Sequence, residues 1–193
     1  MDDISKYRKV TYPIHPLILN RWSKRAMSGK NISDHELMSI FEAARWAPSS
    51  YNNQPWKFLY AKKDTPHWDK FFNLLVEFNQ SWAKNAAALV VILSRKNFEH
   101  NNKLSRTHNF DAGAAWQNMA LQGTSIDLVV HGMEGFSYKK AREELNISED
   151  YDIQAMVAIG RKGLKDTLPL TLQEKELPNN RKNLDIIINE GPF

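Results

Sequence analysis

The chain has 193 residues, of which 42% are hydrophobic, 11% aromatic and 25% charged, a composition typical of a globular protein with a sizeable core. Its 26 Lys and Arg residues exceed its 22 Asp and Glu residues only slightly and form no long run, which favours a small anionic ligand over nucleic acid. The absence of cysteine excludes disulfides, thiolate catalysis, thiolate zinc sites and iron–sulfur clusters, and no apolar stretch is long enough for a membrane helix.

The chain shows no internal repeat and no Pro/Gly/Ser-rich linker, which predicts one domain over residues 1–193. We expect an N-terminal lead-in over residues 1–15 and a polar C-terminal arm over about residues 163–193. The first residues are acidic and lack an apolar region, which favours a cytoplasmic protein without membrane contact.

Four elements are predicted in the first half of the chain. Ser33, with Glu36 three residues later, predicts a capping box and a helix that ends before Pro48. Alternation over residues 56–60 predicts a strand, and apolar spacing over residues 67–82 predicts a single helix. The continuous apolar run at residues 88–94 predicts a strand that is buried on both faces.

Helices and strands continue to alternate in the second half. The Ala-rich segment 111–122 predicts a central buried helix, and residues 127–136 predict a strand that runs into a glycine-containing turn. Ser137 is expected to cap a helix through Leu145, and residues 153–160 predict another strand. This order predicts an α+β fold with a mixed central sheet, although α/β remains open and the strand order is not determined. The polar arm is expected to pack over another surface.

The segment Arg21–Arg25 (RWSKR) combines three cations with one hydroxyl group. Guanidinium and hydroxyl donors in this grouping suit a phosphate group, which accepts bidentate hydrogen bonds from arginine. A solvated basic turn is the alternative interpretation of the same residues.

The loop at residues 47–56 (APSSYNNQPW) is stiffened by a proline near each end and carries uncharged hydroxyl and amide groups between them. Rigidly held amides suit a heteroaromatic ring that has carbonyl and imino groups. An ordinary polar connecting loop is the alternative.

With these two segments in their observed order, the sequence resembles the nitroreductase family of FMN-dependent flavoproteins. The family's opening motif is Arg-x-Ser-x-Arg/Lys, followed about twenty residues later by Pro-Ser-Ser-x-Asn-x-Gln-Pro-Trp, and both stand here at residues 21–25 and 48–56. The later segments DAGAAWQNMALQ, VVHGMEGF and RKNLDIIINEG are also similar. The resemblance implies an obligate homodimer with FMN in its interface and with NAD(P)H as co-substrate.

The resemblance also implies which residues bind the cofactor. Residues of the first motif would contact the phosphate, the ribityl chain and the pyrimidine edge, and residues of the second motif would approach the ring from the partner subunit. Asn79 would meet the O2 side of the flavin, although a solvated helix position is equally consistent with it. The backbone N–H groups of Glu134 and Gly135 would point to flavin N5 and O4, so no side chain is expected to be catalytic. The implied cofactor-binding residues are Arg21, Trp22, Ser23, Arg25, Pro48, Ser49, Ser50, Asn52, Gln54, Asn79, Gly132, Met133, Glu134, Gly135, Arg181 and, as a weaker candidate, Lys182.

The histidines do not indicate a metal site. His100 and His108 flank a polar loop without a third ligand at suitable spacing, so we expect no metal. His131 lies in an apolar strand and is expected to be a core histidine rather than a catalyst.

The favoured function is an oxidoreductase that transfers hydride from NAD(P)H through flavin N5 to a small planar acceptor, such as a nitroaromatic, a quinone or an enone, in a ping-pong cycle. One alternative is a flavin-storage or redox-sensing module without substantial reductase activity. Another is a different chemistry within the same family, such as reductive dehalogenation. The sequence determines neither the acceptor nor the preference between NADH and NADPH.

Overall fold

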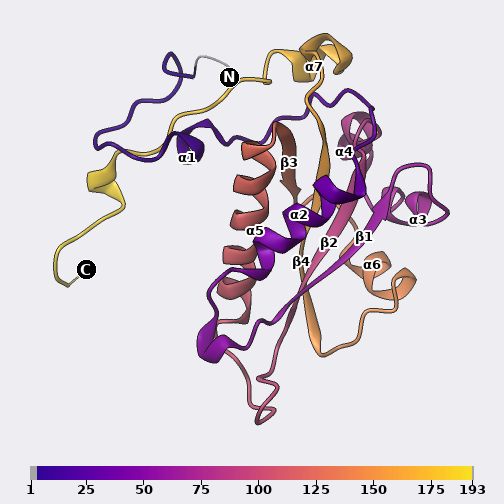
Figure 1. Ribbon diagram of the computed structural model, residues 1–193, viewed down its shortest axis with the longest axis vertical. Coiled ribbons are helices and arrows are strands. Elements are labelled where there is room, and N and C mark those ends of the chain that lie inside the picture. The colour runs from indigo at the N-terminus through magenta and orange to yellow at the C-terminus, as the bar shows by residue number, and fades with distance from the viewer. Residues whose placement is uncertain (1–3, 193) are drawn as a thin grey trace.

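The computed structural model describes residues 4–192, so the first three residues of the lead-in and the last residue of the arm lie outside the described chain. Its centre is a four-stranded sheet in the order β1-β2-β4-β3. The strands are β1 (Trp56–Lys62), β2 (Ala88–Arg95), β3 (Leu128–Met133) and β4 (Tyr151–Arg161). Helices cover the sheet (Figure 1), which confirms the α+β class.

The expectation of a mixed sheet is wrong. Each neighbouring pair of strands in the described sheet is antiparallel. The connections between strands allow either direction, and the pairing is set by contacts between residues far apart in the sequence, which local patterns do not reveal. The strands β1 and β3 form the two opposite edges of this sheet.

Two long helices cover one face of the sheet. Helix α2 (Asp34–Arg45) begins with the predicted capping box of Ser33 and Glu36, and α5 (His108–Ser125) contains the predicted Ala-rich helix and extends it at both ends. Val90 and Ile92 of β2 pack against these helices, whereas their neighbours along the strand face the opposite side. The strand is therefore buried on both faces, as predicted.

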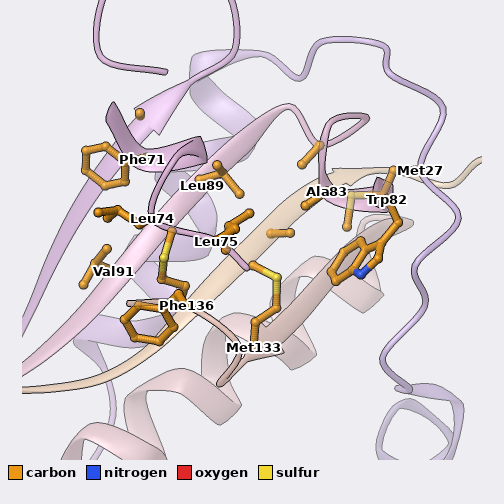
Figure 2. Close-up of a cluster of buried hydrophobic side chains, with 14 of the residues drawn as sticks. Met27, Phe71, Leu74, Leu75, Trp82, Ala83, Leu89, Val91, Met133 and Phe136 are labelled. Carbon is orange, nitrogen blue, oxygen red and sulfur yellow. The ribbon is translucent and has the colours of Figure 1, made fainter. Parts of the chain in front are cut away.

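The opposite face carries a second core (Figure 2). Leu89 and Val91 of β2 lie there with Trp82, Met133 and Phe136. This side is covered by α3 (Trp68–Phe72), α4 (Glu77–Ala83) and α6 (Tyr138–Glu144), and Ser137 caps α6 as predicted. Met133, a predicted site residue, thus places its side chain in the core.

The single helix predicted over residues 67–82 is wrong, because the chain leaves the helical path between α3 and α4. Leu75 forms an isolated β-bridge with Phe136, and hydrogen bonds join Val76 N–H to the Gly135 carbonyl at 3.1 Å and Ser137 N–H to the Leu74 carbonyl at 2.8 Å. These distant partners stabilise an extended segment that apolar spacing alone would assign to a helix. The break brings α4 to the turn that follows β3.

The remaining elements are short. They are α1 (Pro16–Asn20), α7 (Leu170–Gln173) and the 3₁₀ turns η1 (Ser50–Asn52), η2 (Lys165–Thr167) and η3 (Leu184–Ile186). The chain up to α1 and the end of the C-terminal arm, around η3, run together away from the sheet (Figure 1). Ile186, Ile187 and Ile188 of the arm are each more than 60% exposed. Phe110 on α5 is also 79% exposed, so this helix is buried along one side rather than all round.

Candidate functional site

The first motif, residues 21–25, follows α1 outside any helix or strand, and its side chains line two different cavities. Arg21 lines a cavity of about 570 Å³, whereas Trp22 and Lys24 line one of about 390 Å³ beside the last turn of α5. The Lys24 ammonium group lies 5.0 Å from the centroid of the Trp22 ring. Ser23 stays close to Arg21, with 3.5 Å between Oγ and Nη1.

The larger cavity is strongly basic. Five cationic residues line it, and no carboxylate residue is among its described lining residues. The structure brings Arg21 together here with Arg181 and Lys182 from the arm, as the resemblance implies, and adds Arg8 and Lys9 from the lead-in. Burial lowers the pKa of the Arg21 guanidinium, and the nearby charge of Arg181 lowers it further. An anion in this cavity would relieve the repulsion between the cations.

Two buried side chains hold the second half of this motif. The Glu176 carboxylate is 7% exposed, and its Oε1 accepts the N–H groups of Arg25 at 2.7 Å and Ala26 at 2.9 Å. His131 Nδ1 lies 2.7 Å from the Lys24 carbonyl oxygen, so this nitrogen carries the hydrogen. Burial lowers the pKa of His131 to about 4, which leaves the ring neutral at pH 7. As predicted, His131 is a hydrogen-bonded core residue.

The turn after β3 presents an unused backbone donor. The Gly135 carbonyl accepts from Val76 N–H at 3.1 Å and from Asn79 Nδ2 at 2.9 Å, whereas its own N–H donates to no partner in the described part of the chain. Asn79 Oδ1 in turn accepts from Trp82 Nε1 at 3.3 Å. Both ends of the Asn79 amide are therefore engaged within the protein, and a contact with flavin O2 stays a prediction.

Gly135 is required by close packing rather than by its backbone angle. A Cβ atom at this position would lie 2.6 Å from Asn79 Nδ2 and 3.1 Å from Val76 Cγ2. At Gly132 a Cβ would lie 3.2 to 3.3 Å from the Trp116 ring. Glu134 is exposed beside this turn. The glycines thus allow other side chains to approach the backbone on which the predicted site depends.

The second motif forms a strained loop. The backbone of Tyr51, Asn52 and Gln54 has φ angles of 53°, 53° and 48°, a left-handed conformation that costs energy in residues other than glycine and is common at functional sites. Ser49 Oγ accepts Gln54 N–H at 3.0 Å, and Gln54 Nε2 donates to the Asn52 carbonyl at 3.2 Å. Pro48 is exposed at the start of the loop.

The structure does not bring the two motifs together within one chain. The second motif leads into β1, and Ser50 N–H donates to Asp111 in the first turn of α5 at 3.2 Å. The first motif lies by the last turn of α5 and, through His131, against β3. The two edge strands are about 14 Å apart, since three spacings of about 4.8 Å separate them, and the 18 residues of α5 span about 27 Å.

Three residues of the site were not found in the sequence. They are Arg8, Glu176 and Trp82. Arg8 and Glu176 act through partners far away along the chain and stand in neither motif, so no local signal identifies them. Trp82 lies three residues after Asn79 in α4 and donates its indole hydrogen bond to Asn79, so its helical spacing from Asn79 is the one local signal.

Within residues 4–192, no group of three or more His, Asp or Glu side chains could hold a metal ion, and the His108 Nδ1 atom lies 2.8 Å from Ser94 Oγ. No helix in the same residues is long and apolar enough to cross a membrane.

The sequence is similar to nitroreductases and flavin oxidoreductases. The sequence profile described as the Nitroreductase family matches residues 18–77 and 62–161. A protein from Archaeoglobus fulgidus, assigned as an NADH dehydrogenase/NAD(P)H nitroreductase, is 30% identical over 149 residues, which are 75% of this chain and 82% of that protein. The major NAD(P)H-flavin oxidoreductase of Aliivibrio fischeri is 30% identical over 97 residues, or 48% of this chain and only 44% of the relative.

Solved structures share the fold over almost the whole chain. The crystal structure of an oxidoreductase containing FMN is 43% identical, with a TM-score of 0.92 over 96% of each chain. The structure of a Desulfovibrio desulfuricans nitroreductase in complex with FMN has a TM-score of 0.73 at 23% identity, covering 95% of this chain and 99% of that one. Both the family profile and the Archaeoglobus relative cover most of this sequence, and the chain belongs to the nitroreductase family.

Proposed function

We propose that this chain is an FMN-dependent oxidoreductase that takes hydride from NAD(P)H and passes it to a small planar acceptor of the nitroaromatic, quinone or enone type. The observation that carries the proposal is the basic cavity, in which Arg21, Arg181 and Lys182 converge without a carboxylate residue among the described lining residues. A flavin phosphate, with a charge of about −1.5 to −2 at pH 7, fits this donor set. The names of its relatives, an NAD(P)H-flavin oxidoreductase and an FMN-containing oxidoreductase, support the same cofactor and reductant.

The turn after β3 suits the isoalloxazine ring, at the end of FMN opposite its phosphate. The Gly135 N–H, which donates to no acceptor within residues 4–192, is a fixed donor for an acceptor atom on the ring edge. Asn79 and Trp82 stabilise the turn by hydrogen bonds to the Gly135 carbonyl and to each other. Bound FMN would supply the redox chemistry, because its N5 atom can accept a hydride and release it again. The protein binds and orients the cofactor, and no protein nucleophile or base is assigned.

A complete site would require a homodimer. The loop at residues 48–54 lies at the opposite sheet edge from Gly135, so a second copy of the chain could supply this loop to the first copy's cavity and turn. The exposed Phe110 and the isoleucines of the arm offer apolar surface for such an association. We therefore place FMN between two chains, with residues 1–193 as one domain and the arm over about residues 163–193 reaching toward the partner.

The test is anaerobic reduction of the purified, flavin-loaded protein. Addition of NADH or NADPH should bleach the yellow absorbance, and a subsequent nitroaromatic or quinone acceptor should restore it, with parallel-line steady-state kinetics for the two substrates. A protein that stays yellow with both nucleotides would instead be a flavin store or sensor and would refute the proposed activity. Bleaching followed by halide release from halogenated acceptors alone would identify reductive dehalogenation.

A further inference from the structure

The basic cavity contains a buried arginine that lies outside both motifs. Arg8 is only 8% exposed and lines the cavity with Arg21 and Arg181. Burial of a guanidinium group is unfavourable unless its charge is compensated, yet no acidic residue is among the described residues that line this cavity. The position of Arg8 therefore requires an explanation beyond packing.

Arg8 joins three segments of the chain. Its Nε donates to the Asn179 carbonyl at 3.0 Å, and its Nη1 donates to the Arg21 carbonyl at 2.8 Å and to the Leu19 carbonyl. One planar guanidinium group thus fixes the backbone of the first motif relative to the arm that carries Arg181. The remaining nitrogen, Nη2, is buried without a hydrogen-bond partner in the described chain.

The electrostatic environment agrees with this geometry. The pKa of Arg8 is lowered by burial and then by the charges of Arg181 and Arg21. The three guanidinium groups therefore repel one another in the absence of an anion, and each gains from an anion bound among them.

We propose that Arg8 is a positioning residue of the phosphate site: it holds Arg21 and the Arg181 arm in place and adds a third positive charge, so that the protein selects a phosphorylated flavin over riboflavin. This inference rests on the proposed function. It assigns a specific role to a residue that the two sequence motifs do not include.

The experiment compares two ligands that share the isoalloxazine ring and differ in the phosphate. Apo-protein is titrated with FMN and with riboflavin, and flavin fluorescence quenching gives both dissociation constants. Arg8→Ala should weaken FMN binding by about tenfold or more and change riboflavin binding by less than about twofold, because riboflavin has no phosphate. Arg8→Lys retains the positive charge but loses the planar guanidinium contacts. Its FMN affinity should therefore fall between those of Arg8→Ala and the unmodified chain.

Arg142→Ala is a matched control. Arg142 also donates to three backbone carbonyl groups, those of Ile147, Ser148 and Tyr151, but it lies outside the basic cavity. Its substitution should lower stability and leave the ratio of the FMN and riboflavin dissociation constants unchanged.

Each outcome decides the question. Equal weakening of FMN and riboflavin binding in the Arg8 variants would show a general scaffold role and overturn the inference, and so would unchanged FMN binding. If Arg8→Ala does not fold, the comparison of Arg8→Lys with the unmodified chain carries the same test. Binding of neither flavin by the unmodified chain would refute the proposed function itself and the inference with it.

Discussion

The contact between Asn79 and Gly135 allows a quantitative test of the turn that follows β3. In Gly135→Ala, the new Cβ would lie 2.6 Å from Asn79 Nδ2, so the amide must move. It would then lose its bond to the Gly135 carbonyl and its bond from Trp82 Nε1, which measure 2.9 and 3.3 Å. Trp82 is 1% exposed, and an unpaired buried donor costs about 1–3 kcal/mol. We expect Gly135→Ala to destabilise the protein by about 2–3 kcal/mol.

Asn79→Ala removes the same two bonds directly and should cost a similar amount, about 2–3 kcal/mol. Because Asn79→Ala also removes the atom with which the new Cβ collides, the two substitutions should not be additive. The double variant is expected to cost little more than either single variant, which gives a coupling free energy of about 2 kcal/mol.

The assay is denaturant unfolding of the four apo-proteins at one fixed protein concentration, since association would make the measured stability depend on concentration. Anaerobic flavin reduction in FMN-saturated protein provides a second measurement, and Gly135→Ala should slow it because the donor N–H is displaced. Additivity of the two single-variant free energies to within about 0.5 kcal/mol would refute the proposed packing of Asn79 against Gly135.

Three further predictions concern the cofactor, the phosphate site and His131. Chromatography of the extracted chromophore should give FMN, one per chain, and recovery of FAD would contradict the single-phosphate cavity. Arg21→Ala should weaken FMN binding by about tenfold to a hundredfold with a smaller effect on the reduction rate of bound flavin; unchanged affinity would refute the phosphate assignment. The pKa of His131 is lowered from 6.5 to about 4 in the folded protein, so its contribution to stability is complete above pH 6.5 and is lost as the pH falls toward 4. The resulting loss in the free energy of unfolding should reach roughly 3 kcal/mol. This loss should be absent in His131→Gln, and an identical pH profile of unfolding in His131→Gln and the unmodified protein would refute the prediction.

Local patterns predicted the elements whose formation depends on neighbouring residues. The capping box of Ser33 and Glu36 set the start of α2, and the apolar run at residues 88–94 predicted a strand between two cores. Both signals depend on the period of side chains along one element, so no distant contact was needed to interpret them.

Other features depend on residues far apart in the chain. The break between α3 and α4 is stabilised by hydrogen bonds to residues 135–137, and the direction of each strand follows from its long-range pairing. Apolar spacing contains neither kind of information, and both predictions failed there.

The candidate site shows the same division. The first motif identified Arg21, the family resemblance of the C-terminal segment identified Arg181, and the structure places these two residues together in one cavity. Arg8 and Glu176 contribute through hydrogen bonds to several distant backbone groups, which the motifs do not encode. The separation of the loop at residues 48–54 from the first motif follows from the order of the strands, which puts β1 and β3 at opposite edges of the sheet. Local sequence patterns do not determine this order.

Complementation between two defective chains tests most directly whether the site is shared by two subunits around FMN. One chain carries Arg21→Ala, and the other carries Asn52→Gly, which removes the side chain where φ is 53° and where glycine is unstrained. The chains are given different affinity tags, mixed from the unfolded state and purified as the doubly tagged species. A shared site predicts that each heterodimer regains one site with unmodified residues, and therefore half the FMN of the unmodified protein at full affinity and half its NAD(P)H-dependent activity. Heterodimers that bind FMN no better than either defective homodimer would contradict the shared site.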